Sequence, residues 1–265
     1  MKKKIFMIVL CVALVAVSAF ALFACGSNQT DSEYILGKKT LICGITLYEP
    51  MNYADEEGEM TGFDTEFAQA VCAELGIEAK FQVIKWSSKE TELNAKYIDC
   101  IWNGFTVNDE RKQNVEFTKS YLNNTQCVVV KTSALANFTS SASCSGKTAA
   151  AEAGSAGESA AKDLTAEAKV VSVGAQMNAL NEVKSGNVDF AVVDVILANS
   201  IVGNGNFNDL SIATAIQLEA EEYAIGFRKG SDMAEKVNAV IDKLLENGKL
   251  LEIATKYGLQ GQLIQ

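Results

Sequence analysis

The stretch "IWNGFTVNDERKQ", residues 101–113, decides the fold. It opens with apolar residues typical of a buried strand, which ends at Trp102 and Asn103. Asn108 then supplies the side chain of a helix N-cap and places Arg111 in the first turn of that helix. A strand followed at once by a helix is the repeating unit of parallel sheets, whose ligands bind beyond the carboxyl ends of the strands. The stretch therefore predicts an architecture and also the edge of the sheet that carries the site.

The same alternation continues on both sides of this stretch. Apolar runs of strand length alternate with segments in which apolar residues recur three and four positions apart. The expected strands cover residues 41–46, 79–84, 98–104, 125–131, 147–153, 169–173, 188–195 and 223–229, and the expected helices cover 64–76, 157–164, 176–186 and 232–258, with two more opening at Ser87 and Asn108. This order predicts an α/β fold of parallel sheets flanked by helices.

Residues 1–24 form a predicted export signal outside the fold. Three lysines precede an almost wholly apolar run, Ile5–Phe23, and a small residue stands before Cys25. The Ala-Cys junction resembles the lipobox of bacterial lipoproteins, in which Cys25 is lipidated and becomes the new N-terminus. Residues 25–36 would then be a polar tether. The alternative is an uncleaved membrane anchor. Both interpretations place the rest of the chain outside the cytoplasmic membrane.

Composition excludes several classes of function. The 265-residue chain has a formal net charge of −10, which argues against nucleic acid as a partner and against broad contact with anionic lipid. It contains no histidine, so histidine-based catalysis and histidine metal sites are excluded. We expect no metal and no cofactor. The remaining cysteines are predicted to be buried thiols, with a bridge between two of them as the alternative, Cys43 to Cys100. They are Cys43, Cys72, Cys100, Cys127 and Cys144.

The opening stretch has the parts of a carboxylate receptor. Gly104 lets the backbone approach a ligand, and Thr106 offers a hydroxyl. Free N–H groups and the positive end of the helix dipole point the same way. Arg111 adds a planar guanidinium that grips a carboxylate through two hydrogen bonds. The alternative is a surface arginine paired with Glu110 or Glu116.

Three other features are candidates for the same site. Asp194 ends an apolar strand and would hold an ammonium group there, or else cap the next helix. The segment "AEAGSAGES", residues 151–159, places Ser155 in a nest of N–H groups before a helix, without the ending of a P-loop. Tyr48 and Trp86 each follow a strand, where they would flank a side chain or simply pack in the core.

Taken together, these stretches resemble one family. "GITLYEPMNY", "YIDCIWNGFTVNDERKQNVEFTKSYL", "AEAGSAGES", "SGNVDFAVVD" and "LEAEEYAIGFRKGSDMAEKVN" resemble, in order, the extracellular solute-binding proteins of polar amino-acid ABC importers, over nearly all of residues 37–258. The resemblance implies a two-lobe, type II periplasmic-binding-protein-like fold with two hinge strands. Lobe 1 would comprise residues 37–122 plus 223–265, and lobe 2 residues 123–222. A polar or basic free amino acid would bind between the lobes and pass to a membrane permease.

The resemblance also implies roles for the candidate residues. Arg111, with Thr106 and the backbone of Gly104, would bind the α-carboxylate of the ligand. Asp194 would bind the α-ammonium group, and Ser155 with its neighbouring N–H groups would assist from lobe 2.

The ligand side chain is less constrained by the sequence. The resemblance places Tyr48 and Trp86 on either side of it, with Asn103 beside it. Aromatics with Asn103 suit a glutamine-like amide, whereas aromatics with Glu152 or Glu49 suit arginine or lysine. Which of these two glutamates faces the cleft is left open by the sequence.

Two other classes of function share this fold. An enzyme such as a dehydratase would need a general acid or base in the cleft, for which Glu152 or Glu49 would have to serve. A sensor ectodomain would be followed by a membrane span and an output domain. We expect a binding protein and not an enzyme.

Overall fold

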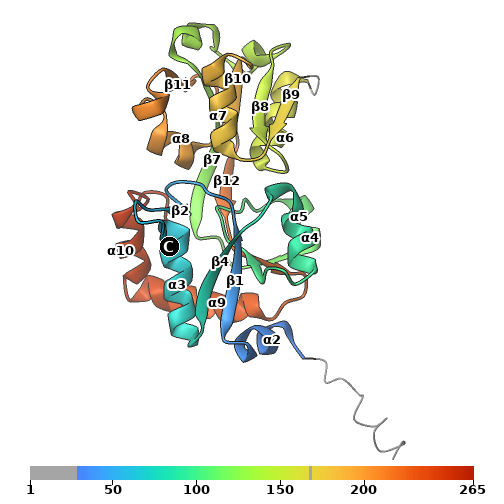
Figure 1. The fold of residues 1–265 in the computed structure, drawn as a ribbon, viewed down its shortest axis with the longest axis vertical. Coiled ribbons are helices and arrows are strands. Elements are labelled where there is room, and N and C mark those ends of the chain that lie inside the picture. The colour runs from blue at the N-terminus through green and yellow to red at the C-terminus, as the bar shows by residue number, and fades with distance from the viewer. Residues whose placement is uncertain (1–28, 167–168) are drawn as a thin grey trace, which may run out of the picture.

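The computed structural model describes residues 29–166 and 169–265 of the chain. The export signal predicted over residues 1–24 and the lipidation predicted at Cys25 lie outside the described residues. Within the described part of the chain, no helix is both long and apolar enough to cross a membrane. The described residues form two lobes, each built around its own sheet, as Figure 1 shows.

The first lobe contains a five-stranded sheet in the order β4-β1-β5-β13-β6. β1 runs parallel to β4 and β5, whereas β13 runs antiparallel to β5 and β6. Its strands are β1 (Thr40–Ile45), β4 (Glu78–Val83), β5 (Cys100–Ile101), β6 (Val115–Phe117) and β13 (Gly226–Arg228), and a small hairpin joins β2 (Tyr53–Ala54) to β3 (Met60–Thr61). Its helices are α2 (Asp31–Gly37), α3 (Phe63–Leu75), α4 (Lys89–Asn94), α5 (Asp109–Asn114), α9 (Met233–Glu246) and α10 (Lys249–Lys256).

The second lobe contains a sheet in the order β11-β7-β10-β8-β9. β8 runs parallel to β9 and β10, and β7 runs antiparallel to β10 and β11. Its strands are β7 (Leu122–Lys131), β8 (Ala149–Glu152), β9 (Val170–Val173), β10 (Phe190–Asp194) and β11 (Leu210–Ile212). Its α-helices are α6 (Ala156–Thr165), α7 (Gln176–Ser185) and α8 (Val195–Ile201). The strands predicted over residues 125–131 and 223–229 correspond to β7 and β13, which run antiparallel to their neighbours, so the parallel pairing expected for them is wrong. β6 and β11 lie outside every predicted strand, and they also pair antiparallel.

Two strands connect the lobes. The first half of β7 pairs antiparallel with β12 (Ala220–Tyr223), and its second half pairs with β10 inside the second lobe. Figure 1 shows β7 and β12 side by side between the two sheets. The lobe boundaries inferred from the resemblance fall at these two strands and remain a prediction.

The N-terminal tether predicted over residues 25–36 is partly wrong. α2 occupies Asp31–Gly37 and begins with a complete capping box between Thr30 and Glu33. Ser32 then donates to the carboxylate of Asp232 through its backbone N–H (2.8 Å) and its hydroxyl (2.7 Å). Because these bonds attach the helix to the start of α9, any tether ends before α2.

The cysteines within the described residues are buried free thiols, as predicted for them. Cys43 and Cys100 occupy paired positions on β1 and β5, with their Sγ atoms 3.6 Å apart and no bridge between them.

A buried carboxyl group connects the core of the first lobe to its functional edge. Phe67 packs edge-on against Trp102 and Tyr121, with ring centroids 5.1 and 5.3 Å apart. Beside them, Asp64 accepts from the Tyr121 hydroxyl (2.8 Å) and from the backbone N–H of Gly104 (2.7 Å). Burial raises the pKa of Asp64 to about 7, although both hydrogen bonds oppose the shift. Asp64 therefore holds the loop after β5 against α3.

Gly104 is the point where this loop has no room for a side chain. Its φ is +54°, and a Cβ there would lie 2.9 Å from ring atoms of Tyr48 and of Tyr223. Gly258 makes a useful comparison, because its φ is +71° but a Cβ there would meet nothing within 4 Å.

We therefore expect Gly104→Ala to destabilise the protein more than Gly258→Ala. Both variants place alanine in the left-handed region, which costs about 1–2 kcal/mol. Only Gly104→Ala also overpacks the two tyrosines, at a further cost of about 1–3 kcal/mol. Urea unfolding of the two variants measures the difference, and equal losses of stability would contradict this account of the loop.

Candidate functional site

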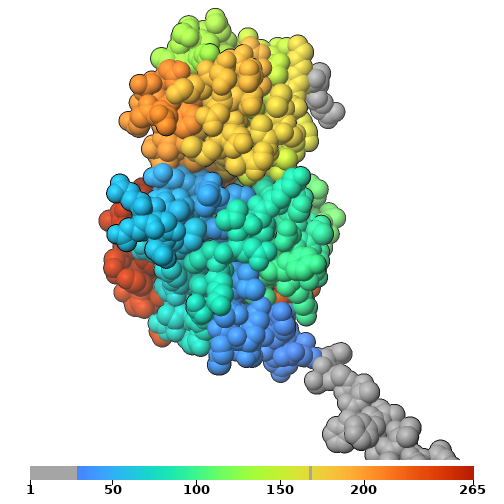
Figure 2. Space-filling model, in the orientation of Figure 1, coloured from blue at the N-terminus to red at the C-terminus, as the bar shows by residue number. Residues whose placement is uncertain are grey.

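Five ionisable side chains meet at the junction between the lobes. Lys89 and Arg111 are cations of the first lobe, and Glu152, Asp194 and Glu221 are carboxylates. All are buried except Glu221, which is partly exposed. Glu152 and Asp194 end the neighbouring parallel strands β8 and β10, at the sheet edge where the sequence predicts a ligand. On the face shown in Figure 2, atoms of the two lobes touch across this junction.

Arg111 reaches from the first lobe to the second. Asn108 accepts from the Arg111 backbone N–H (2.8 Å), so the predicted N-cap is confirmed. The guanidinium Nη1 donates to the carbonyl oxygen of Thr106 (2.7 Å), and Nη2 donates to that of Gly154 (3.3 Å). Its Cζ lies 4.7 Å from the centroid of the Phe105 ring. The alternative of a surface ion pair is wrong, because Arg111 is buried at the junction.

Lys89, which the sequence did not single out, reaches the same carbonyl group. Its Nζ donates to Gly154 O (3.0 Å) and lies 5.0 Å from the centroid of the Trp86 ring. Burial, and after it the charge of Arg111, lowers the pKa of Lys89 to about 8. Two cations of the first lobe therefore converge on one backbone oxygen of the second.

The pairing of β7 with β10 and with β12 brings the carboxylates of Asp194 and Glu221 together. Gln126 is paired with Asp194 between β7 and β10, and Asn124 is paired with Glu221 between β7 and β12. Asn124 and Gln126 are two positions apart, so their side chains emerge on the same face of β7. Asp194 Oδ1 accepts from Asn124 Nδ2 (2.8 Å) and from Gln126 Nε2 (2.6 Å).

The remaining oxygen of Asp194 accepts from Gln176, whose side-chain oxygen in turn accepts from the Asp194 backbone N–H (2.9 Å). Asp194 occupies the N-cap position of α8, as the alternative expected, but its carboxylate makes no capping bond there. Burial raises the pKa of Asp194, while the amide donors oppose that shift.

Glu221 connects the hinge to both lobes. Its Oε1 accepts from Thr106 Oγ1 (3.1 Å) in the first lobe and from Gln126 Nε2 (2.7 Å) and Asn124 Nδ2 on β7. Burial and the charge of Asp194 raise the pKa of Glu221 to about 7. The Thr106 hydroxyl is thus engaged with a carboxylate on the returning hinge strand.

Glu152 is the acid without a partner. Its side chain is 2% exposed, and among the described residues none donates a hydrogen bond to its Oε1. Burial, with repulsion from Asp194, raises the pKa of Glu152 to about 8, and Lys89 partly offsets that rise. The side chain therefore faces the charged junction rather than solvent, which answers the question that the sequence left open for this residue.

The two aromatic candidates, Tyr48 and Trp86, are buried at the junction between the lobes. The hydroxyls of Tyr48 and Tyr223 lie 2.9 Å apart, and the Asp194 charge acts on both. Trp86 packs edge-on against Phe105, with ring centroids 5.7 Å apart.

Two predicted ligand contacts are used by the protein itself. Asn103 Oδ1 accepts from the backbone N–H (3.0 Å) and the hydroxyl (2.8 Å) of Thr46, and its Nδ2 donates to Thr46 O (2.9 Å). The Gly104 N–H is taken by Asp64. Both residues therefore hold the loop that carries Thr106.

Ser155 is the N-cap of α6, the helix of the second lobe that faces Arg111. Its hydroxyl accepts from the Glu158 backbone N–H (3.0 Å), and Glu158 in turn accepts from the N–H of Gly154 (3.0 Å). A cavity of about 310 Å³ lies beside this turn. It is lined by Lys89, Glu90, Asn108, Glu110, Arg111, Gly154, Ser155, Glu158, Ser159 and Lys162.

Several known proteins are similar to this chain in sequence and in fold. The arginine-binding extracellular protein ArtP of Bacillus subtilis (strain 168) is 32% identical over 243 residues, which cover 90% of this chain and 92% of ArtP. A histidine-bound substrate-binding protein of an ABC uptake transporter from Streptococcus pneumoniae superposes with a TM-score of 0.80 at 32% identity, covering 87% of this chain and 97% of that one.

A third similar protein is the ancestral amino-acid-binding protein AncCDT-1, a precursor of cyclohexadienyl dehydratase. It superposes with a TM-score of 0.77 at 25% identity, covering 85% of this chain and 98% of that one. These structures confirm the predicted two-lobe, type II periplasmic-binding-protein-like fold. Residues 41–260 match the bacterial extracellular solute-binding proteins, family 3, and the chain belongs to that family.

Proposed function

We propose that this protein captures a cationic α-amino acid between its lobes and delivers it to the membrane permease of an ABC importer. It would do so from the outer face of the cell membrane, anchored through a lipid on Cys25. The observation that carries the choice of ligand is the buried, unpartnered Oε1 of Glu152. Unpaired polar atoms in a low-dielectric site are costly, so Glu152 needs a donor from the ligand.

The charges of the junction favour the same choice. Three carboxylates face two cations, so the site carries an excess of negative charge when all five groups are ionised. A neutral zwitterion leaves that excess in place. Arginine or lysine adds one positive charge and balances it. The arginine-binding name of ArtP agrees with this assignment.

In the proposed complex each ligand group has a partner of opposite charge. Arg111 and the N-terminal turn of α5 bind the α-carboxylate, with Ser155 and its neighbouring N–H groups facing it from the second lobe. Asp194 binds the α-ammonium group. Tyr48 and Trp86 enclose the side chain, and Glu152 accepts from its cationic end. A ligand that joins the two lobes binds the closed arrangement best, and so shifts the protein toward it.

A second candidate function follows from the pKa of the same residue. Glu152 is largely protonated at neutral pH when no cation is bound, as a general acid would be. AncCDT-1 is described as a precursor of a dehydratase. We favour binding without turnover, because the site as proposed needs only paired charges. Consumption of a hydroxylated, ring-containing acid that stops in Glu152→Gln would support the enzyme instead.

Replacing Arg111 by alanine tests the carboxylate site. The variant should bind L-arginine about 2–5 kcal/mol more weakly, because the ligand carboxylate would be left unpaired in a dry cleft. Lys112→Ala changes the exposed neighbour on the same helix and should leave affinity unchanged. Isothermal titration calorimetry measures both, and native-like affinity in Arg111→Ala would overturn the assignment.

Glu152→Gln tests the side-chain site, because it keeps the shape of the residue and removes the charge. We expect the variant to lose about 1.5–3 kcal/mol of affinity for L-arginine and to keep or gain affinity for citrulline, which has no charge on its side chain. Glu222→Gln, at the exposed neighbour of Glu221, should change neither affinity. Equal losses of affinity for L-arginine and citrulline would show that Glu152 does not recognise the charge of the ligand side chain.

The raised pKa of Glu152 also predicts the pH dependence of binding. Below pH 8 the free protein holds a proton on Glu152 that a cationic ligand must displace, so binding releases protons and affinity rises with pH between 6 and 8. Lys89, whose pKa is about 8, loses its positive charge as the pH rises through 8. This removes a cation that repels the cationic end of the ligand, so affinity should not fall there. Titrations in two buffers with different ionisation enthalpies count the protons, and proton uptake at pH 7 would have the wrong sign.

A further inference from the structure

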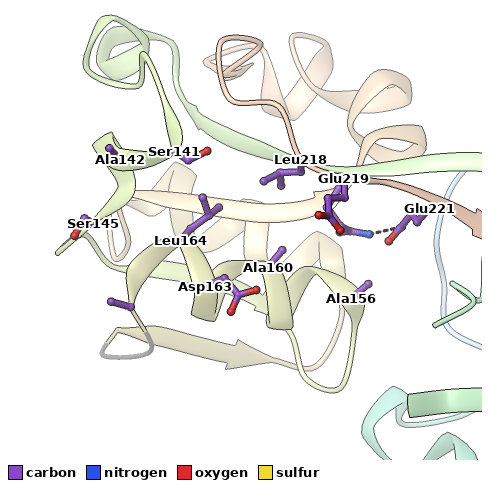
Figure 3. Close-up of a pocket in the computed structure, with 12 residues that line it drawn as sticks. Ser141, Ala142, Ser145, Ala156, Ala160, Asp163, Leu164, Leu218, Glu219 and Glu221 are labelled. Carbon is purple, nitrogen blue, oxygen red and sulfur yellow. Dashed lines mark hydrogen bonds between the residues drawn. The ribbon is translucent and has the colours of Figure 1, made fainter. Parts of the chain in front are cut away.

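A second pocket, of about 610 Å³, lies in the second lobe away from the cavity beside Arg111. The two share no lining residue. Figure 3 shows the pocket between α6, the short helix Ser141–Cys144 and the segment that leads into β12. Its apolar surface comes mainly from Ala142, Ala156, Ala160, Leu164 and Leu218.

The inner wall of the pocket holds a side-chain acceptor without a donor, on a residue that is mostly buried. Gln126 is 6% exposed, and its Nε2 donates to both Asp194 and Glu221. These two bonds fix the amide, because a swapped amide would turn its oxygen toward two carboxylates. No described residue donates to Gln126 Oε1, which lies 2.9 Å from where a Cβ on Gly157 would stand. The free acceptor is therefore at the first turn of α6, which lines the pocket.

The other polar groups of the pocket are mainly acids. Glu219 and Glu221 come from the segment entering β12, and in Figure 3 they lie across from Asp163 on α6. Glu221 receives all three of its hydrogen bonds on Oε1, and among the described residues none donates to Oε2. Among the residues that the structure describes, no lysine or arginine lines the pocket. Its walls thus accept hydrogen bonds and carry negative charge, with apolar surface between.

We propose that this pocket is a second ligand site, and that its ligand is a linear aliphatic diamine. One ammonium group, with its three donors, pairs with Gln126 Oε1 and Glu221. The methylene chain covers Ala156, Ala160 and Leu218, and the second ammonium group reaches Asp163. A hard metal ion fits less well, because it prefers six or more oxygen ligands and the pocket is half apolar.

The proposed site is coupled to the amino-acid cleft through two shared side chains. Gln126 and Glu221 line the pocket, and both belong to the hydrogen-bond group around Asp194. A cation in the pocket reduces the negative potential that attracts an ammonium group to Asp194. The two ligands should therefore weaken each other's binding, and by thermodynamic linkage the factor is the same in both directions.

The test titrates the full chain with 1,5-diaminopentane by calorimetry, alone and with L-arginine saturating the cleft. Ala160→Leu fills the pocket from a helical position, and Asp163→Asn removes one carboxylate at an exposed site. Glu246→Gln removes an exposed carboxylate from α9 in the other lobe and serves as the control. The neutral analogue 1,5-pentanediol separates charge recognition from apolar contact.

We expect saturable binding of one diamine that persists with L-arginine present and is weakened about fivefold or more by it. Ala160→Leu should abolish this binding, Asp163→Asn should weaken it about fivefold or more, and Glu246→Gln should leave it unchanged. Circular dichroism checks that Ala160→Leu is folded. If that variant does not fold, Asp163→Asn still tests the site. Absence of saturable binding, equal binding of the diol, or binding that neither pocket variant reduces would overturn the proposal.

Discussion

The burial of three carboxylates where the lobes meet is the constraint on which the rest of the structure depends. An isolated ionised carboxylate costs many kcal/mol to remove from water, so it must find donors, a cation or a proton. Asp194 has three amide donors, Glu221 has two amides and a hydroxyl, and Glu152 shows no donor for one of its oxygens. The raised pKa values of all three show that these partners do not fully replace water. In the proposed complex, a ligand cation supplies the donor that Glu152 lacks within the described residues.

The hinge serves this purpose as well as joining the lobes. Side chains alternate along a strand, so Asn124 and Gln126 emerge on the same face of β7. Their partners in the strand pairing, Glu221 on β12 and Asp194 on β10, emerge on that same side. A slip of one residue between β7 and β12 would turn Glu221 to the opposite face and bring Glu222 in its place. The register that connects the lobes is therefore also the register that builds the proposed ammonium side of the site.

The sequence predicts the parts of this site that depend on neighbours along the chain. The N-cap at Asn108, the position of Arg111 and the strand ending at Asp194 are all local patterns, and the structure bears them out. The capping box of α2, at Thr30 and Glu33, is equally local and could have been found.

The remaining parts depend on partners distant in the chain. Asn103 looks like a ligand residue until Thr46, from another strand, engages its amide. Glu221 and Gln126 carry no local signal, because each gains its role only when β12 pairs with β7. Lys89 begins a short helix and looks like a surface lysine in the sequence. Only the contact between the lobes brings its Nζ to the carbonyl oxygen of Gly154. Long-range pairing of this kind is not encoded in the spacing of residues within one element.

The carbonyl oxygen of Gly154 bears on how the proposed carboxylate end of the site would select its ligand. Lys89 and Arg111 both donate to it across the junction, so the two cations share an acceptor that belongs to the protein itself. Gly154 has a φ of +76°, and a Cβ there would lie 3.1 Å from Cα of Ser87 in the first lobe, so the close approach needs glycine. A carbonyl is a neutral acceptor, whereas a carboxylate brings a full negative charge to the two cations and can accept two parallel bonds from a guanidinium. In the proposed complex, a ligand carboxylate would therefore bind these cations better than the internal carbonyl does, whereas a ligand with only a neutral acceptor would merely replace that carbonyl.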